Sequence, residues 1–426
     1  MKLNLLYLIA LCALLASCGK DRSNEYEERT ARDHWMLDVM RQEYLWGDHL
    51  KDLSWKEYFA KPKDFFNKLT KQAPVTDSWS WCAVDTIAED AHQRGSFNHL
   101  DSYGLDVVVM TDPTGETSRQ FGRIMTVYEG SPASRCGLKR GDFITTIDGA
   151  KFTATTAKNL INGKSRTLTV EHLDVNEAEG TYVWSDQVTV ELAASEYVED
   201  KAFPIHRVLT TSAGKVAYLM CNRLTEGQTE RSGTLTTYRD ELSSIMASLA
   251  GVEYDAFVLD LRLCNDGTLD MACRLASYFV DESQRGQIFA KTLYREQKSA
   301  SNTSIPFNDE SIANHIQTKA LFVITSSYTQ GAAEWLIRGL RKALGDESVL
   351  TLGTKTAGQI VTTSTIPSDF FVTLHPAVAY VADADGDYAY DSGIAPDYER
   401  NERNSLYLYP YGNEKELLLN TILNHE

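Results

Sequence analysis

The chain is poor in the residue patterns that build disulfide frameworks and zinc sites. Its seven cysteines form no CxxC pair, and five of them remain once Cys12 and Cys18 are assigned to the leader region. The nine histidines are scattered, and no HExxH motif occurs. We therefore expect neither a disulfide framework nor a metal site, and we assign no cofactor.

The chain also lacks the basic excess that a nucleic-acid partner requires. Lys and Arg number 42 against 59 Asp and Glu, so the formal net charge is -17 at pH 7. A field of this sign repels phosphate backbones, and we expect no nucleic-acid partner. Apolar material is plentiful, since 43% of the 426 residues are hydrophobic. This is enough for sizeable cores in two or three domains.

The first 18 residues, MKLNLLYLIALCALLASC, are typical of an export signal. One Lys precedes an apolar run that is too short to span a bilayer and ends in small residues at Cys18. The segment LASC resembles the lipobox of bacterial lipoproteins, which implies that Cys18 carries the lipid anchor. The protein is then expected on a membrane of the cell envelope, at its periplasmic or surface face. An ordinary signal peptide that contains a Cys is the alternative.

A tether and a small helical domain are predicted over residues 19–95. From Glu25 to about Leu50, apolar residues recur at spacings of three and four, as one face of a helix requires. A second helical stretch is predicted from Trp55 to about Lys71, before the run PVTDSWSW breaks the pattern.

Residues 96–195 show short alternating strands separated by Gly and Asp, which indicates a β-rich module. The run GSPASRCGLKRGDFITTIDG, residues 130–149, resembles the signature of a bacterial PDZ domain. Tyr103, Gly104 and Leu105 stand where such domains have their carboxylate-binding loop. The resemblance implies that their backbone N–H groups receive a polypeptide C-terminus and that the next strand accepts the peptide by edge addition. The alternative is that Gly104 only opens a strand.

From residue 196 to 426 the pattern becomes α/β. Strands are predicted at 216–220, 256–261, 320–325 and 349–353, and helices at 269–280 and 331–344. Near the end, the strand-like segments 371–382 and 388–390 flank DADGD. We interpret DADGD as a hairpin turn, because its spacing departs from that of an EF-hand calcium loop.

Three segments of this last domain resemble the C-terminal processing, or tail-specific, serine peptidases. They are VLDLRLCNDG at 258–267, ITSSYTQGAAEWLI at 324–337 and LGTKTAGQ at 352–359. With the PDZ-like module before them, they imply a crotonase-like (ClpP/crotonase-type) α/β peptidase domain that acts on polypeptides. The resemblance also implies a serine nucleophile, a neutral lysine as its base, a supporting glutamine and backbone N–H donors for the oxyanion.

The residues at the matching positions cannot perform that mechanism. Gly331 stands at the nucleophile position, Gln359 at the lysine position and Thr363 at the position of the supporting glutamine. Glycine carries no nucleophile, and glutamine is not a base at any relevant pH.

The oxyanion side departs from the family pattern as well. Ala332 follows the nucleophile position, and Asn265 and Asp266 replace two glycines of the first segment. Side chains here crowd the approach of a substrate, and Asp266 is expected to bring negative charge toward an oxyanion.

We therefore expect a family member that binds polypeptide termini or extended segments without cutting them. One alternative is an active serine peptidase with displaced catalytic residues, for which Ser326, Ser327, Thr329, Lys355 and Cys264 are the candidates. Each of these also has an ordinary interpretation: a helix cap, a solvated loop lysine or a buried cysteine. The other alternative is a non-catalytic modulator that partners an active peptidase in the same envelope.

Overall fold

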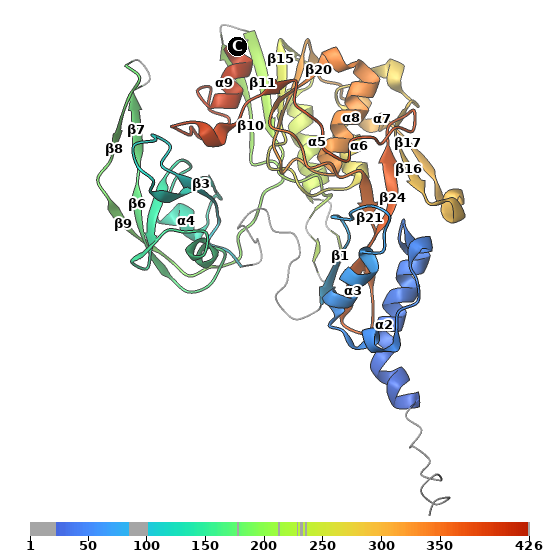
Figure 1. The fold of residues 1–426 in the computed structure, drawn as a ribbon. Helices are drawn as coiled ribbons and strands as arrows, with labels where there is room; N and C mark the ends of the chain where they lie inside the picture. Colours follow the sequence, from blue (N-terminus) through green and yellow to red (C-terminus); the bar gives the residue numbers. More distant parts are fainter. Residues whose placement is uncertain are drawn as a thin grey trace, which may run out of the picture. The chain divides into compact units, whose positions relative to one another are not determined.

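The computed structural model describes residues 23–84, 101–176, 179–211, 214–227, 229–230, 233–234 and 237–424. The chain divides into two compact units, one of residues 1–89 with 363–378 and one of residues 90–362 with 379–426 (Figure 1). The predicted lipobox and Cys18 lie outside the described residues. Within the described part, no helix has the length and apolar character needed to cross a membrane.

The first unit is a small helical body with a three-stranded sheet. It contains α2 (Ser23–Glu43), η1 (Gly47–His49), η2 (Trp55–Phe59) and α3 (Pro62–Thr70), and the sheet has the order β1 (Trp81–Val84), β23 (Val372–His375), β22 (Ile366–Pro367). The second predicted helix is therefore broken into η2 and α3. Ala60 is extended, and Pro62 occupies the start of α3, where its missing N–H costs nothing.

Residues 363–378 group with this first unit, whereas the sequence assigned them to the last domain. The cause is strand pairing, because β23 runs antiparallel to β1 over four residue pairs. The amide of Leu45 also donates to the carbonyl of Ala377 at 2.8 Å. Such long-range pairs leave no local signal in the sequence.

The PDZ-like part of the second unit is a sheet of the order β2-β3-β4-β6-β9, with β5 on β4. Its elements are β2 (Leu105–Thr111), β3 (Gln120–Val127), α4 (Pro132–Arg135), β4 (Phe143–Ile147), β5 (Ala150–Lys151), η3 (Thr156–Leu160), β6 (Arg166–Glu171) and β9 (Val188–Leu192). A hairpin of β7 (Leu173–Asn176) and β8 (Thr181–Trp184), which the sequence did not predict, extends from it (Figure 1). One cluster of buried hydrophobic residues forms the core of this PDZ-like part.

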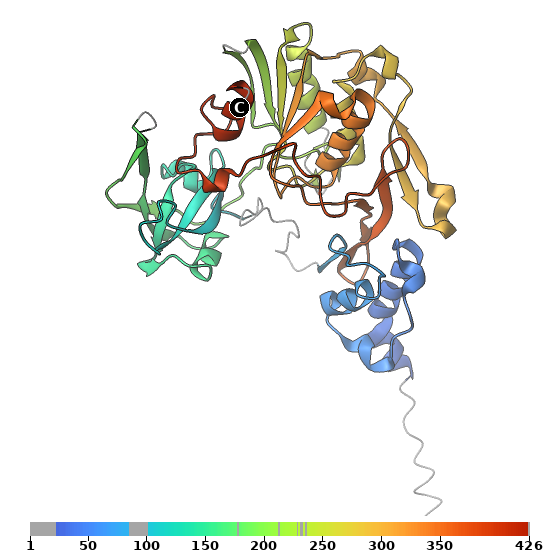
Figure 2. The ribbon, with the colours of Figure 1, turned by 45° about the horizontal axis from the view of Figure 1, so that its top comes forward.

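The peptidase-like part is built on a six-stranded sheet of the order β10-β11-β15-β19-β20-β25. Its strands are β10 (Ile205–Thr211), β11 (Gly214–Met220), β15 (Ala256–Asp260), β19 (Leu321–Thr325), β20 (Val349–Gly353) and β25 (Tyr398–Glu399). From β11 to β25 all neighbours are parallel. The helices α5 (Thr237–Leu249), α6 (Leu269–Ser277) and α8 (Ala332–Leu344) pack on one face, and α9 (Leu417–Asn424) packs on the other (Figure 2).

A second sheet, of the order β17-β16-β24-β21, adjoins these helices. It contains β16 (Ile288–Tyr294), β17 (Thr303–Pro306), β21 (Val361–Thr363) and β24 (Ala377–Ala382). The unit is completed by short elements outside these two sheets: β12 (Thr229–Glu230), β13 (Gly233–Thr234), β14 (Glu253–Tyr254), β18 (Gln317–Thr318), η4 (Glu282–Gln284), η5 (Glu296–Ser301), α7 (Asp309–Ile312), η6 (Asp346–Ser348) and η7 (Glu402–Asn404).

The predicted hairpin around DADGD is wrong in its second strand, because residues 388–390 form none. The loop itself is a turn, in which the carbonyl of Asp383 accepts from the amide of Gly386 at 3.0 Å. Its carboxylates pair with Arg338 and Lys342 of α8. Among the residues that the structure describes, no cluster of His, Cys, Asp or Glu suits a metal ion.

A buried charge network joins the peptidase-like sheet to the PDZ-like module. Arg262, whose side chain is 1% exposed, contacts Asp260 at 2.7 Å, Glu416 at 2.8 Å and also Glu402. Glu402 in turn accepts from Arg140 of the PDZ-like module at 2.7 Å. Burial alone would raise the pKa of Glu402, but the guanidiniums of Arg140 and Arg262 lower it to about 2. The carboxylate is therefore charged throughout the neutral range.

We expect Glu402→Gln to lower the free energy of unfolding by about 3 kcal/mol at pH 7, because two buried guanidiniums lose a charged partner. A carboxyl whose pKa is lowered in the fold stabilises fully above its ordinary value of about 4.3, and this stabilisation is lost as the pH falls toward 2. The difference in the free energy of unfolding between the variant and the native chain, measured by urea unfolding, should therefore be smaller at pH 3 than at pH 7. The exposed Glu414→Gln is the control, and an equal gap at both pH values would contradict the assignment.

Candidate functional site

The loop from β19 to α8 carries the hydroxyls that were candidates for a displaced nucleophile. Ser326 donates its hydroxyl to the carbonyl of Arg262 and accepts from the amide of Tyr328 at 3.0 Å. Thr329 is fully buried and donates to the carbonyl of Leu261 at 2.9 Å. Both hydroxyls therefore hold this loop against the end of β15, as capping hydroxyls do.

Gly331 forms a sharp turn from this loop into α8. It is buried, with φ +55° and ψ -110°, a left-handed conformation in which a side chain is strained. A strained turn between strand and helix is also where many hydrolases hold their nucleophile. A Cβ added at Gly331 would have three atoms of the Gln359 amide as its nearest neighbours, the first at 2.9 Å. The structure thus brings the predicted nucleophile and lysine positions face to face.

Glu334, three residues into the turn, fixes both partners of this pair. Its carboxylate is fully buried and accepts from the amides of Gly331 at 3.0 Å, Gly358 at 2.6 Å and Gln359 at 2.8 Å, and from the hydroxyl of Thr356. Burial raises the pKa of Glu334, and these hydrogen bonds offset only part of the rise. This positioning role of Glu334 was not predicted from the sequence.

The side chain of Gln359 is engaged through both of its polar atoms. Its carbonyl oxygen accepts from Nε2 of Gln330 at 2.9 Å, and its own Nε2 donates to the carbonyl of Val361 at 3.0 Å. A hydrogen-bonded amide removes no proton, so the Gly331 and Gln359 pair supplies neither nucleophile nor base. Thr363 ends β21, where the chain passes into the first unit, and its predicted role stays untested.

On the oxyanion side, the negative charge expected from Asp266 is paired with an arginine. The carboxylate of Asp266 accepts from Arg223 at 2.8 Å, and the carbonyl of Asp266 accepts from the amide of Leu224 at 2.8 Å. The charge of Asp266 is therefore compensated by an arginine that the sequence did not indicate. Asn265 is half-buried beside it, and Ala332 is buried at the start of α8.

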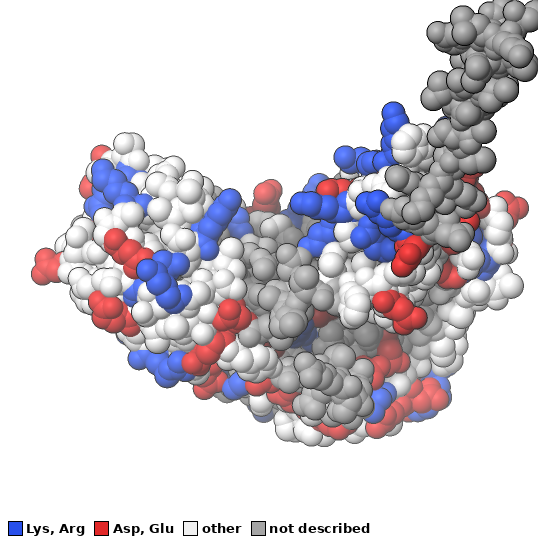
Figure 3. All heavy atoms as spheres, turned by 90° about the horizontal axis from the view of Figure 1, so that it is seen from below, with Lys and Arg blue, Asp and Glu red and all other residues white. Residues whose placement is uncertain are grey.

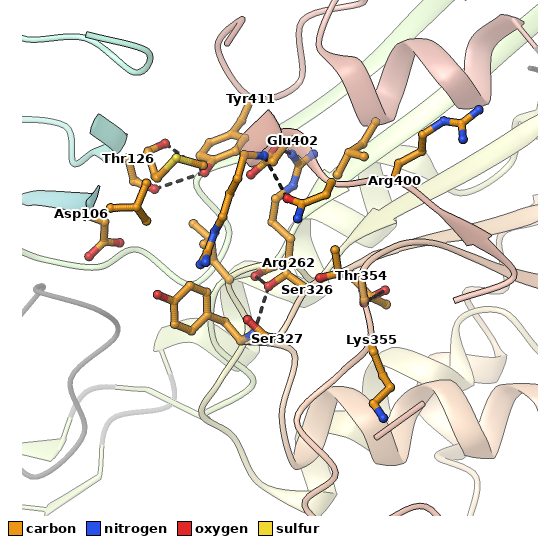
Figure 4. Close-up of a pocket in the computed structure, with 18 of the residues that line it drawn as sticks. Asp106, Thr126, Arg262, Ser326, Ser327, Thr354, Lys355, Arg400, Glu402 and Tyr411 are labelled. Carbon is orange, nitrogen blue, oxygen red and sulfur yellow. Dashed lines mark hydrogen bonds and ion pairs between the residues drawn. The ribbon is translucent and has the colours of Figure 1, made fainter. Parts of the chain in front are cut away.

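The remaining candidates for a displaced mechanism do not meet. Cys264 is fully buried in the core cluster beneath α8. Ser327 and Lys355 are exposed, and in Figure 4 the ammonium of Lys355 points away from Ser327. A hydroxyl is activated only by a base within hydrogen-bond reach, so this arrangement does not supply the predicted pair.

The loop at the start of β2 is occupied by bonds within the chain. Tyr103 and Leu105 are fully buried, and the amide of Gly104 donates to the hydroxyl of Ser102 at 2.9 Å. Gly104 has φ +74°, and a Cβ there would lie 2.1 Å from Cβ of Ser131. A carboxylate bound at this loop would have to displace the Ser102 hydroxyl, so the predicted peptide contact stays a prediction.

Comparison with known proteins gives the following matches. Residues 31–81 match the model described as the peptidase S41 N-terminal domain, residues 123–172 match a PDZ domain, and residues 215–400 match peptidase family S41. A candidate CtpA-like serine protease of Staphylococcus aureus strain N315 is 26% identical over 291 residues, which cover 66% of this chain and 51% of the relative. A carboxy-terminal-processing protease of Bartonella bacilliformis is 24% identical over 282 residues, which cover 65% of this chain and 57% of the relative. The chain therefore spans little more than half the length of these two relatives.

Solved structures extend these similarities to the whole fold. A crystal structure of a candidate S41 protease from Bacteroides fragilis superposes with a TM-score of 0.77 and 28% identity, covering 92% of this chain and 96% of that one. The photosystem II D1 C-terminal processing protease has the same fold at a TM-score of 0.51 and 14% identity, covering 88% and 93%.

Glu334→Gln tests the positioning role of the buried carboxylate. The amide offers one acceptor oxygen in place of two and turns an NH₂ group toward donors, so we expect a loss of about 2–3 kcal/mol in the free energy of unfolding. Hydrogen exchange at the amides of Gly358 and Gln359 should accelerate in parallel. The exposed Glu347→Gln should change neither quantity, and unaltered exchange in Glu334→Gln would refute the role.

Proposed function

Because the chain belongs to peptidase family S41 but has Gly331 and Gln359 facing each other at the turn into α8, we propose that it binds polypeptides without hydrolysing them. The observation that carries this proposal is what surrounds Gly331. A Cβ added there would have the side-chain amide of Gln359 as its nearest neighbour. Neither residue of the pair offers a hydroxyl, an amine or a thiol. Peptidase chemistry of the serine type needs a nucleophile and a base at contact distance.

Binding without chemistry is supported by the PDZ-like module. Its strand β2 lies at one edge of the sheet, and an edge strand can pair with an extended peptide through backbone hydrogen bonds. Val109 on this strand is 40% exposed. An extended polypeptide segment is therefore the ligand class that we propose.

We expect the native chain to remain unlabelled by a fluorophosphonate probe and to leave an unfolded protein intact by mass spectrometry. Gly331→Ser with Gln359→Lys should restore only feeble labelling, because Asn265 and Asp266 remain on the oxyanion side and one lost oxyanion donor costs on the order of 100-fold to 1000-fold in rate. Adding Asn265→Gly and Asp266→Gly should raise the rate. Cleavage by the native chain that Ser327→Ala abolishes would replace this proposal with the displaced mechanism.

We also propose that the protein is a lipoprotein of the cell envelope, anchored through Cys18. Besides the lipobox-like run, the surface of the first unit supports a membrane location. Lys and Arg side chains gather on its face in Figure 3. In η2, the 63% exposed Trp55 lies under the ammonium of Lys56 at 5.5 Å, and Arg29 of α2 lies over Phe59 at 5.7 Å. Aromatic rings beside cations suit the headgroup layer of an anionic membrane.

Replacing Cys18 with Ala should release the protein from the membrane fraction, because the acyl chains lose their attachment point. The measurement is membrane fractionation, with intact-mass analysis of the native protein as the second readout. A matched change of Cys12 to Ala should leave the mature mass unaltered. Membrane association that persists in the Cys18→Ala variant, together with no acyl mass on the native chain, would reject the anchor.

A further inference from the structure

The first unit exposes two pairs of aromatic side chains. In η2, Trp55 and Phe59 are 63% and 46% exposed. At the tip of the hairpin between β22 and β23, Phe370 and Phe371 are 40% and 71% exposed. Single exposed apolar side chains are ordinary, whereas a group of them on one side of a small body marks an interaction surface.

Both pairs lie beside the same stretch of α2. The guanidinium of Arg32 donates to the carbonyl of Ala60, the residue after Phe59, at 2.8 Å. The ring of Trp35 contacts the ring of Phe370, with 6.1 Å between their centroids. Arg32 and Trp35 are three residues apart in a helix and are therefore neighbours on its surface. We call the four exposed rings, Trp55, Phe59, Phe370 and Phe371, the aromatic patch.

The backbone at Phe371 is strained. Its φ is +56°, a left-handed conformation that a bulky side chain rarely adopts. The hydroxyl of Ser368 holds the tip in this shape by donating to the carbonyl of Val372 at 2.7 Å. Because the ring of Phe371 is largely exposed, burial within the chain offsets little of the strain. Strain of this kind is typical of positions that serve a function.

The surroundings of η2 are cationic, although the chain as a whole is acidic. Residues 51–71 contain six Lys against three Asp and Glu, and two of these acids already pair with a cation. Lys56 lies over the ring of Trp55, and Lys61 follows Phe59 by two residues. Neither lysine forms an ion pair with a residue that the structure describes. Exposed rings beside unpaired ammonium groups match an anionic bilayer, where rings enter the headgroup layer and cations contact the lipid phosphates.

The predicted lipid anchor lies within reach of this patch. α2 begins at Ser23, five residues after Cys18, and five extended residues span at most about 18 Å. The ring of Phe59 contacts the ring of Tyr26 in the first turn of α2, with 5.7 Å between the centroids. An acylated Cys18 therefore keeps this end of the first unit near the bilayer.

We propose that the aromatic patch docks onto an anionic lipid bilayer, with its rings in the headgroup layer and with Lys56 and Lys61 against the lipid phosphates. The inference rests on the proposed lipoprotein, because the anchor at Cys18 brings the patch to the membrane. The patch is then a second membrane contact. It fixes how the first unit is turned toward the bilayer, which acyl chains on a short tether leave free.

The charge of the patch is tested by co-sedimentation with vesicles. The protein is the mature chain without acyl groups, residues 19–426, and the vesicles are phosphatidylcholine alone or with about one third phosphatidylglycerol. We expect an affinity about 20-fold higher for the anionic vesicles, which sodium chloride weakens. Lys56→Gln with Lys61→Gln should bring this ratio close to one, since each lysine contributes about fivefold. Lys151→Gln, at an exposed lysine of the second unit, should keep the ratio.

Trp55→Ser with Phe371→Asn tests the rings. We expect about 10-fold weaker binding to the anionic vesicles, because two rings no longer enter the headgroup layer. The midpoint of thermal unfolding should stay unchanged or rise, since Asn adopts the left-handed conformation with less strain than Phe. A purely structural role of the two rings would lower this midpoint instead. Tyr398→Ser, at an exposed ring of the second unit, should leave vesicle binding unaltered.

The outcomes for the patch and for the anchor are separate. Equal vesicle binding by the native chain and the ring variant would overturn the patch and leave the anchor at Cys18 intact. Native protein without acyl mass would reject the anchor, whereas weaker vesicle binding by the ring variant would still support the patch. If the native chain binds no vesicles, or binds neutral and anionic vesicles equally, docking onto anionic lipid is wrong.

Discussion

The buried guanidinium of Arg262 is the constraint on which the second unit depends. A fully buried cation is tolerated only with carboxylates around it, and Arg262 draws them from Asp260 at the end of β15, from Glu402 and from Glu416. Glu402 extends the network to Arg140 of the PDZ-like module. The ring of Tyr411 lies between the two cations, 3.9 Å from one guanidinium carbon and 4.9 Å from the other. The positions of both guanidiniums are thus set by charge pairing inside this network.

The turn at Gly331 is held by an organised set of hydrogen bonds at the positions that the family motif assigns to catalysis. Glu334 still organises four donors around the entrance of α8, and residue 359 still faces residue 331. These bonds also satisfy buried backbone amides, which would be costly to leave unpaired. These hydrogen bonds give the loop a stabilising role that does not depend on hydrolysis.

The family and the fold class predicted from the sequence are confirmed, because motifs and periodicity are local properties. The strand predicted at 349–353 coincides with β20, and the helix predicted at 331–344 is α8 after its first residue. α5 was missed, since Ser243, Ser244 and Ser248 within it have little helix propensity and instead bond back to carbonyls of the preceding turn.

The pair of Gly331 and Gln359 could be predicted from motif spacing, but its surroundings could not. Arg223 reaches Asp266 from the end of a different strand, and Glu334 binds amides of a loop that lies more than 20 residues further along the chain. The lipid anchor at Cys18 remains a prediction, because it lies outside the described residues. Sites assembled from distant loops depend on tertiary structure that no single segment encodes.

Residues 363–378 return to the first unit, and this changes how the two units are connected. The chain leaves the first unit once, re-enters it at Thr363 and leaves again after Val378, so three backbone crossings join the two units. Because β23 pairs with β1 over four residue pairs, a single proteolytic nick between residues 84 and 101 would not free the N-terminal piece. That piece would stay associated through the sheet and would separate only on denaturation. Where other proteases are present, this topology means that one cut in the backbone between residues 84 and 101 would not remove the first unit.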